Sequence, residues 1–246
     1  MKKLILIQND SPGTGKSTLA LCLHRYLQNH GVAHQRLSLT EEDVAAEGSQ
    51  ALDANALTPR NFLAAIDASP LTILDVASGL GEYFGKFYQG SEMEQILHEA
   101  GVAVSVVLPV TADRESFDSV IEAAEVYSDN VEYLIAHLVT SCYDEDDKAW
   151  DTSYAARVMD MFEAVELYIP EITFHLELSS EHMNLDSALQ HGDAEERLGK
   201  EYVKWDRRVM GQIDSARQYL FGDAFRPTLA PKPVKTARKA KAKTVS

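Results

Sequence analysis

The stretch from Lys3 to Thr18 reads KLILIQNDSPGTGKST and decides the fold. It opens with an apolar run, Lys3 to Ile7, which is too short for a buried helix and predicts a central strand. A loop from Gln8 to Gly15 follows, and apolar residues at helical spacing then predict a helix from Ser17 to His30. Strand, glycine-rich loop and helix in this order form the context in which a phosphate-binding loop is credible.

The residue types in this loop suit the recognition of phosphate. Gly13 and Gly15 allow backbone N–H groups to turn inward and approach phosphate oxygens closely. The helix that begins near Lys16 adds its positive end, and the Lys16 ammonium can reach a β- and a γ-phosphate. The Ser17 hydroxyl can ligate Mg²⁺. We therefore expect the loop to bind a nucleotide through Gly13, Thr14, Gly15, Lys16, Ser17 and Thr18.

One position departs from the usual phosphate-loop pattern. That pattern begins with a glycine five positions before Gly15, and this sequence has Asp10 there. The alternative interpretation is an ordinary glycine-rich turn ahead of a helix. Strand, Gly-x-Gly-Lys-Ser-Thr and helix together favour the phosphate loop.

A second signal lies at the end of a later apolar run. Asp75 closes the run that starts at Leu71, and an acidic residue at the end of a neighbouring strand can hold Mg²⁺ through water. Gly79 follows four residues later, and its N–H could meet a γ-phosphate. The alternative is a strand-end carboxylate that caps the next turn. Next to a phosphate loop we favour the metal role for Asp75.

The rest of the chain alternates between strand and helix patterns. Apolar runs predict strands at Arg36–Leu39, Leu71–Val76, Val102–Val110 and Val131–Val139, and weaker ones at Leu167–Ile169 and Thr173–Leu178. Helices are predicted at Thr58–Ala68, Ser91–Ala100, Arg114–Tyr127 and Tyr154–Ala164, and an acidic surface loop at Tyr143–Asp151. This alternation predicts an α/β fold with a mostly parallel sheet, helices on both faces and nucleotide at the carboxyl ends of the strands.

The last part of the chain divides into a long helix and a basic tail. The segment from Asp193 to Phe221 has an apolar stripe at helical spacing, which indicates packing on the protein's own sheet or, as the alternative, a dimer contact. The stripe consists of Leu198, Tyr202, Trp205, Val209, Ile213, Ala216 and Leu220. We expect residues 1–225 to form one nucleotide-binding domain and residues 226–246 a disordered tail.

Charge is distributed unevenly along the 246 residues. The tail has 7 positive and 0 negative residues, whereas the other 225 residues carry 16 positive and 38 negative ones. The tail could hold DNA or an acidic membrane surface, or it could be a solubilising terminus or an intramolecular partner of the acidic body. No apolar run is long enough for a membrane span. The two cysteines, Cys22 and Cys142, indicate a reducing compartment, and we expect a cytoplasmic protein.

Three motifs together resemble one family. The phosphate loop, Asp75-Val76-Ala77-Ser78-Gly79 and the run from Val106 to Asp113 are similar to the ParA/MinD-type ATPases, the deviant Walker A, SIMIBI-class branch of P-loop NTPases. The resemblance is greatest to the plasmid-associated TraL/StbC-like group. It implies Mg²⁺-dependent ATP hydrolysis by a homodimer that recruits a protein partner, in plasmid partition, stability or conjugation.

The sequence departs from this family at several functional positions. The family's second lysine, which acts across the dimer, is replaced by Ser11; another cation could substitute for it, and Arg60 and Arg114 are candidates. The aspartate that orients the attacking water corresponds to Glu42, or as a second choice Asp43, although both could belong to a solvated acidic turn. The family's adenine-contacting asparagine is absent from the corresponding Val139-Thr140-Ser141.

Two other functions are compatible with the same loop. A small-molecule kinase would need an arginine-rich lid, but the arginines between Asp193 and Arg217 lie on a periodic helix with acids between them. A non-catalytic nucleotide-binding adaptor is the other alternative, and the missing second lysine motivates it.

Overall fold

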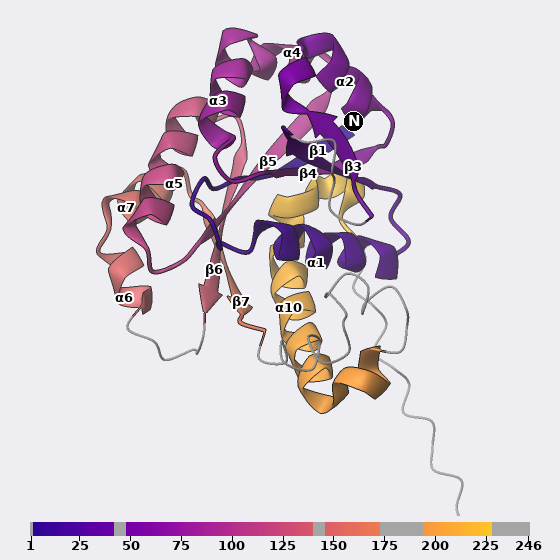
Figure 1. Cartoon of the computed structure of the whole chain (residues 1–246), viewed down its shortest axis with the longest axis vertical. Coiled ribbons are helices and arrows are strands. Elements are labelled where there is room, and N and C mark those ends of the chain that lie inside the picture. Colours follow the sequence, from indigo (N-terminus) through magenta and orange to yellow (C-terminus); the bar gives the residue numbers. More distant parts are fainter. Residues whose placement is uncertain (1, 42–47, 140–145, 173–193, 228–246) are drawn as a thin grey trace, which may run out of the picture.

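A computed structural model describes residues 2–41, 48–139, 146–172 and 194–227. Its centre is a seven-stranded sheet with the order β3-β2-β4-β1-β5-β6-β7, and every pair of neighbouring strands is parallel (Figure 1). The strands are β1 (Lys2–Ile7), β2 (Gln35–Thr40), β3 (Gln50–Asp53), β4 (Leu71–Val76), β5 (Val102–Val110), β6 (Glu132–Val139) and β7 (Val165–Pro170).

Strand β1 occupies the middle of the sheet because its side chains are apolar on both faces. Leu4 and Leu6 pack into the core on one face, whereas Ile5 and Ile7 pack into the core on the other. A strand buried on both sides reads as a continuous apolar run, as this one does. Its last residue, Ile7, lies level with Asp75 of β4 and Val107 of β5, so the loops that follow these strands emerge at one edge.

Helices cover both faces of the sheet (Figure 1). Helix α1 and the long α10 contribute to one core, and the helices from α2 to α7 contribute to the other. Their bounds are α1 Lys16–Asn29, α2 Pro59–Asp67, α3 Gly81–Gly90, α4 Met93–Glu99, α5 Arg114–Tyr127, α6 Asp146–Asp151, α7 Tyr154–Met161 and α10 Ala194–Phe225. The predicted fold class, a parallel α/β sheet with helices on both faces, is confirmed.

Helix α10 packs as its apolar stripe predicts. The stripe residues from Tyr202 to Leu220 are all buried and join the same core as α1. The Trp205 indole N–H also donates a 2.7 Å hydrogen bond to the carbonyl oxygen of Pro170, the last residue of β7. Gly199 and Gly222 have positive φ angles and interrupt the helical geometry near its two ends. Packing of the stripe on the protein's own sheet is therefore confirmed.

Four elements differ from the sequence prediction. Helix α3, strand β3 and the short helix η1 (Ala54–Ala56) were not predicted. The prediction of an acidic surface loop at residues 143–151 is wrong in its second half, where α6 begins at Asp146. Trp150 explains this helix, because its buried ring contacts Phe117 and His137 and so fixes the acidic segment to the core. The predicted strand at residues 173–178, Cys142 and the tail beyond 227 lie outside the described residues.

Within the part of the chain that the structure describes, no helix has both the length and the apolar composition that a membrane crossing requires.

Candidate functional site

The phosphate loop connects β1 to α1 and owes its shape to two glycines. Gly13 and Gly15 have φ angles of 76° and 72°, in the left-handed region that favours glycine. A Cβ atom on Gly15 would also lie only 2.8 Å from Cδ1 of Leu138. No side chain in the described part of the chain caps the first turn of α1, and that turn contains no acidic residue. The positive end of α1 is therefore available to an anion.

Asn9 anchors the start of the loop to the sheet. Its buried amide nitrogen donates hydrogen bonds to the carbonyl oxygens of Pro109, at 2.8 Å, and Ser116, at 2.9 Å. Its side-chain oxygen accepts a 2.9 Å hydrogen bond from the Ser11 N–H. The Asp10 N–H in turn donates to Ser119 Oγ at 2.9 Å. These bonds fix the loop to β5 and α5, two elements that are about a hundred residues away in the sequence.

The Lys16 ammonium lies inside the loop and contacts only neutral oxygens. Its Nζ donates hydrogen bonds to Ser78 Oγ at 2.8 Å, Thr14 Oγ1 at 3.3 Å and the Ser11 carbonyl oxygen at 3.3 Å. Burial lowers the pKa of Lys16, and the nearby carboxylates of Asp75 and Asp10 act in the opposite direction. No carboxylate of the described residues pairs with Nζ within 4 Å, so its charge is available to an anionic ligand.

Ser17 and Asp75 meet at the carboxyl end of the sheet. The Ser17 hydroxyl donates a 2.7 Å hydrogen bond to Asp75 Oδ2. Burial raises the pKa of Asp75, and the Ser17 hydrogen bond and the charges of Lys16 and Arg36 partly offset that rise. The other carboxylate oxygen, Oδ1, is buried and has no hydrogen-bond partner among the described residues. A hydroxyl and an under-coordinated carboxylate are hard oxygen donors, so this pair fits Mg²⁺.

The loop between β4 and α3, residues 77–80, forms the opposite wall of the site. It provides Ser78, the strongest contact of Lys16, and Gly79, whose φ angle is 82°. No described residue accepts a hydrogen bond from the Gly79 N–H. Asp10 ties this wall to the phosphate loop, because its carboxylate accepts hydrogen bonds from the N–H groups of Gly81 and Glu82.

The structure thus brings most of the predicted site residues together. Lys16, Ser17, Asp75 and the loop residues Gly13 to Thr18 lie at one edge, and Gly79 lies in the facing loop. Glu42 and Asp43 lie outside the described residues. Sequence reasoning gave no role to Asn9 or Ser78. The signal for Asn9 is a polar residue directly after a buried strand, and the signal for Ser78 is its place between Asp75 and Gly79.

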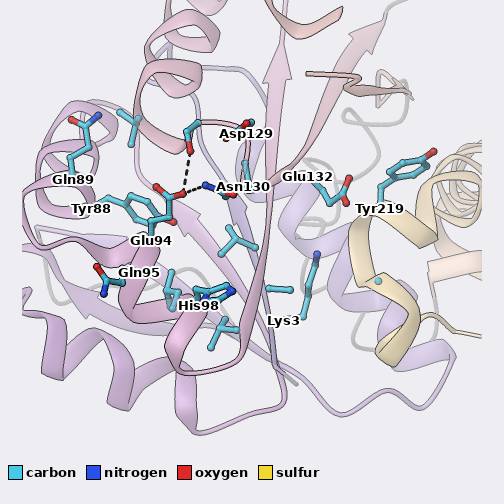
Figure 2. A pocket seen from close by; sticks show the side chains of 18 of the residues that line it. Lys3, Tyr88, Gln89, Glu94, Gln95, His98, Asp129, Asn130, Glu132 and Tyr219 are labelled. Atoms are coloured by element: carbon cyan, nitrogen blue, oxygen red, sulfur yellow. Dashed lines mark hydrogen bonds between the residues drawn. The ribbon is translucent and has the colours of Figure 1, made fainter. Parts of the chain in front are cut away.

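A second concave region lies at the opposite edge of the sheet (Figure 2). This cavity of about 1630 Å³ is lined by residues at the amino ends of three strands, among them Lys3, Val102 and Glu132. None of the predicted site residues lines it. The phosphate loop and this cavity are therefore separate features of the molecule.

The fold and the site define the phosphate-loop class of parallel α/β proteins. No family model matches the chain, and no curated protein matches it either.

Solved structures do resemble it. The MinD cell division protein of Aquifex aeolicus has 15% identity and a TM-score of 0.49, over 85% of this chain and 97% of that one. The MinC:MinD cell division protein complex of the same organism has 13% identity and a TM-score of 0.45, over 85% of this chain and 96% of that one. The signal recognition particle 54 kDa protein of Aeropyrum pernix K1, in complex with GDP, has 14% identity and a TM-score of 0.41. That match covers 88% of this chain and 52% of the other.

Proposed function

We propose that this chain is a Mg²⁺-dependent switch protein that binds and hydrolyses ATP in the manner of the ParA/MinD-type ATPases. The observation that carries the proposal is the buried Lys16 ammonium, which contacts only neutral oxygens beside the uncapped start of α1. A buried cation with no directly paired carboxylate among the described residues is costly unless a ligand pairs with it. A triphosphate supplies that charge, and the adjacent Ser17–Asp75 pair suits the Mg²⁺ that accompanies it.

Each residue of the site has a distinct proposed role. The amides from Gly13 to Thr18 and the Lys16 ammonium neutralise the phosphate oxygens. Ser17 would hold Mg²⁺ directly and Asp75 would hold it through water, and the ion would offset charge on the β- and γ-phosphates. The Gly79 N–H, which has no hydrogen-bond partner among the described residues, is a further donor for the γ-phosphate.

Hydrolysis requires a water molecule in line with the γ-phosphorus. We propose that Glu42, outside the described residues, orients that water. The oxygen of the water forms a bond to the γ-phosphorus while the bond from that phosphorus to the bridging oxygen breaks, which yields ADP and inorganic phosphate. Lys16 and the loop amides stabilise the charge on the phosphate oxygens, so catalysis is mainly positioning and electrostatics.

The proposed output is a nucleotide-dependent homodimer that recruits a protein partner, in plasmid partition, stability or conjugation and in the cytoplasm. Residues 1–225 form the proposed nucleotide-binding domain, and the basic tail, 226–246, is a proposed non-specific DNA contact. Because Ser11 replaces the family's second lysine, a charge that acts across the dimer would come from another residue. Arg60 and Arg114 are exposed and are the proposed candidates.

The central experiment compares Lys16→Ala with wild type in a thermal unfolding assay. Binding of ATP–Mg²⁺ at a hundredfold excess over Kd stabilises a folded protein by about 2.7 kcal/mol. We expect wild type to show a stabilisation of this order and Lys16→Ala to show none. Lys204→Ala removes an exposed lysine of α10 and is the matched control. Equal stabilisation of wild type and Lys16→Ala would overturn the phosphate-loop assignment.

Measurement of phosphate release and molar mass on the same ATP–Mg²⁺ titration separates the proposal from its alternatives. Hydrolysis together with a doubling of mass supports the switch. A doubling of mass without phosphate release supports the non-catalytic adaptor, which the Ser11 replacement motivates. Transfer of phosphate to an added metabolite supports a small-molecule kinase, although α10 packs its apolar stripe on the sheet in the manner of a core helix.

A further inference from the structure

The aspartate that replaces the first glycine of the phosphate loop bridges the two walls of the site. Asp10 Oδ1 accepts a hydrogen bond from the Gly81 N–H at 2.6 Å, and Oδ2 accepts one from the Glu82 N–H at 3.1 Å. Gly81 and Glu82 are the first two residues of α3, a helix of ten residues. One side chain at the start of the phosphate loop therefore holds the start of the helix that follows the facing loop.

The start of α3 explains how an acid is accommodated so close to a phosphate site. The first N–H groups of a helix lack partners within the helix and carry partial positive charge. Leu80, at the N-cap position of α3, makes no side-chain capping bond, so Asp10 provides the cap from a distance of more than seventy residues in the sequence. The partial positive charge at the start of α3 thereby offsets part of the negative charge of Asp10.

Gly81 is matched to this contact. A Cβ atom on Gly81 would lie 2.5 Å from Asp10 Oδ1 and 2.8 Å from its carboxyl carbon. Any side chain at position 81 would therefore push the carboxylate away. The Asp10 carboxylate occupies the space that a side chain at position 81 would need. The φ angle of Gly81 is not positive, so this close approach, and not the backbone conformation, is what requires glycine here.

We propose that Asp10 is a positioning residue that sets the facing loop, residues 77–80, against the phosphate loop. This inference rests on the proposed nucleotide-binding function. Between Asp75 and the clamped residue Gly81 lie Ser78, which contacts Lys16, and Gly79, whose N–H has no described partner. Asp10 thus fixes the distal end of the segment that would meet a γ-phosphate. The γ-phosphate of ATP reaches that segment, whereas ADP has no γ-phosphate. The contact of Asp10 with Gly81 and Glu82 therefore contributes to discrimination between the two nucleotides.

The test compares Asp10→Gly, which restores the usual glycine, with wild type. We expect Asp10→Gly to keep its affinity for ADP–Mg²⁺ and to lose on the order of tenfold in affinity for ATP–Mg²⁺, the equivalent of one hydrogen bond to a charged group. Hydrogen exchange at the amides of Gly81 and Glu82 should accelerate. Asp113→Gly is the matched control, because Asp113 precedes α5 but its side chain makes no capping hydrogen bond there.

Gly81→Ala provides an independent arm. The added methyl should displace the Asp10 carboxylate, reproduce the loss of ATP affinity and lower the melting temperature. In the double variant Asp10→Gly, Gly81→Ala the clash is gone, so we expect no further loss beyond Asp10→Gly alone.

Three results would overturn the inference: an unchanged ratio of ATP to ADP affinity in Asp10→Gly, unchanged amide exchange, or additive losses in the double variant. Failure of wild type to bind either nucleotide would instead overturn the proposed function, so the two failures are distinguishable.

Discussion

At the scale of single residues, the site is a set of buried polar groups in which Lys16 and Asp75 lie near each other without forming a direct ion pair. Lys16 contacts three neutral oxygens, and Asp75 is buried with one oxygen held by Ser17 and the other without a described partner. Burial of a polar atom without a partner costs about 1–3 kcal/mol. Proteins retain buried polar groups at such a cost mainly where a ligand binds them. Mg²⁺ would bind the carboxylate of Asp75, and a triphosphate would pair with Lys16.

Asp75→Ala tests the metal part of this arrangement. We expect it to weaken nucleotide binding in the presence of Mg²⁺ by about 10- to 100-fold, the usual cost of losing a group that acts on a metal through its outer shell. Binding in EDTA should change much less. Calorimetric titration with and without Mg²⁺ measures both affinities, and Asp67→Ala, at an exposed residue that pairs with Lys2, is the control. Equal losses in the two conditions would contradict a metal role.

The sequence predicts some of these residues and not others for a physical reason. Lys16 and Ser17 follow a local pattern that phosphate recognition imposes on neighbouring residues. Asp75 was found because buried parallel strands end at a common edge. The roles of Asn9 and Asp10 depend on partners that are 71 to 107 residues away, and no local pattern encodes such contacts.

At the scale of elements, apolar periodicity predicts the strands that are buried on both faces and the helices with one apolar side. Strand β3 was missed because it lies at the edge of the sheet, where its four residues are only partly buried or exposed. Helix α3 was missed because it contains Gly81, Gly85 and Gly90, which are poor helix formers. Two of these glycines serve close packing, since a Cβ atom on Gly85 would lie 2.9 Å from Val126 and one on Gly81 would meet Asp10.

Helix α10 should contribute strongly to stability through its buried stripe. Ile213 is fully buried in the core that α10 shares with α1 and the sheet. We expect Ile213→Ala to lower the free energy of unfolding by about 3 kcal/mol, because it removes buried methyl groups and leaves a cavity. Arg208→Ala, at an exposed position of the same helix, should change it by less than about 0.5 kcal/mol. Urea unfolding measures both, and equal effects would contradict the packing of this face.

At the scale of the whole molecule, the two edges of the sheet differ in the charged groups that they present. The carboxyl edge presents the Lys16 ammonium and the start of α1, which attract anions. The cavity at the amino edge is acidic, because six carboxylates line it with only Lys3 and His98 as basic residues (Figure 2). Those carboxylates belong to Glu92, Glu94, Glu125, Asp129, Glu132 and Asp223. The phosphate groups of a nucleotide are therefore expected to bind beside Lys16 at the carboxyl edge and not in this acidic cavity.

Lys3, in the acidic cavity, makes the stability of the whole molecule depend on pH in the alkaline range. Its side chain is buried, and burial lowers its pKa from 10.5 to about 8 despite the attraction of Glu132. Below about pH 8 the Lys3 amine is charged in both the folded and the unfolded protein. The folded protein then carries the full free-energy cost of burying that charge. Between about pH 8 and 10.5 the folded state binds fewer protons than the unfolded chain, so this cost declines as the pH rises.

Lys3→Met should therefore stabilise the protein at pH 7, by on the order of 3 kcal/mol, since one unit of pKa corresponds to about 1.4 kcal/mol and the lowering from 10.5 to about 8 already includes the attraction of Glu132. At pH 10.5 the gain should be mostly lost, because Lys3 is then largely uncharged in the folded wild type. Urea unfolding at the two pH values measures the difference. Lys2→Met, at the neighbouring position that pairs with Asp67, controls for the loss of one positive charge. A destabilised Lys3→Met at pH 7 would show that attraction to the surrounding carboxylates outweighs the cost of burial at this edge.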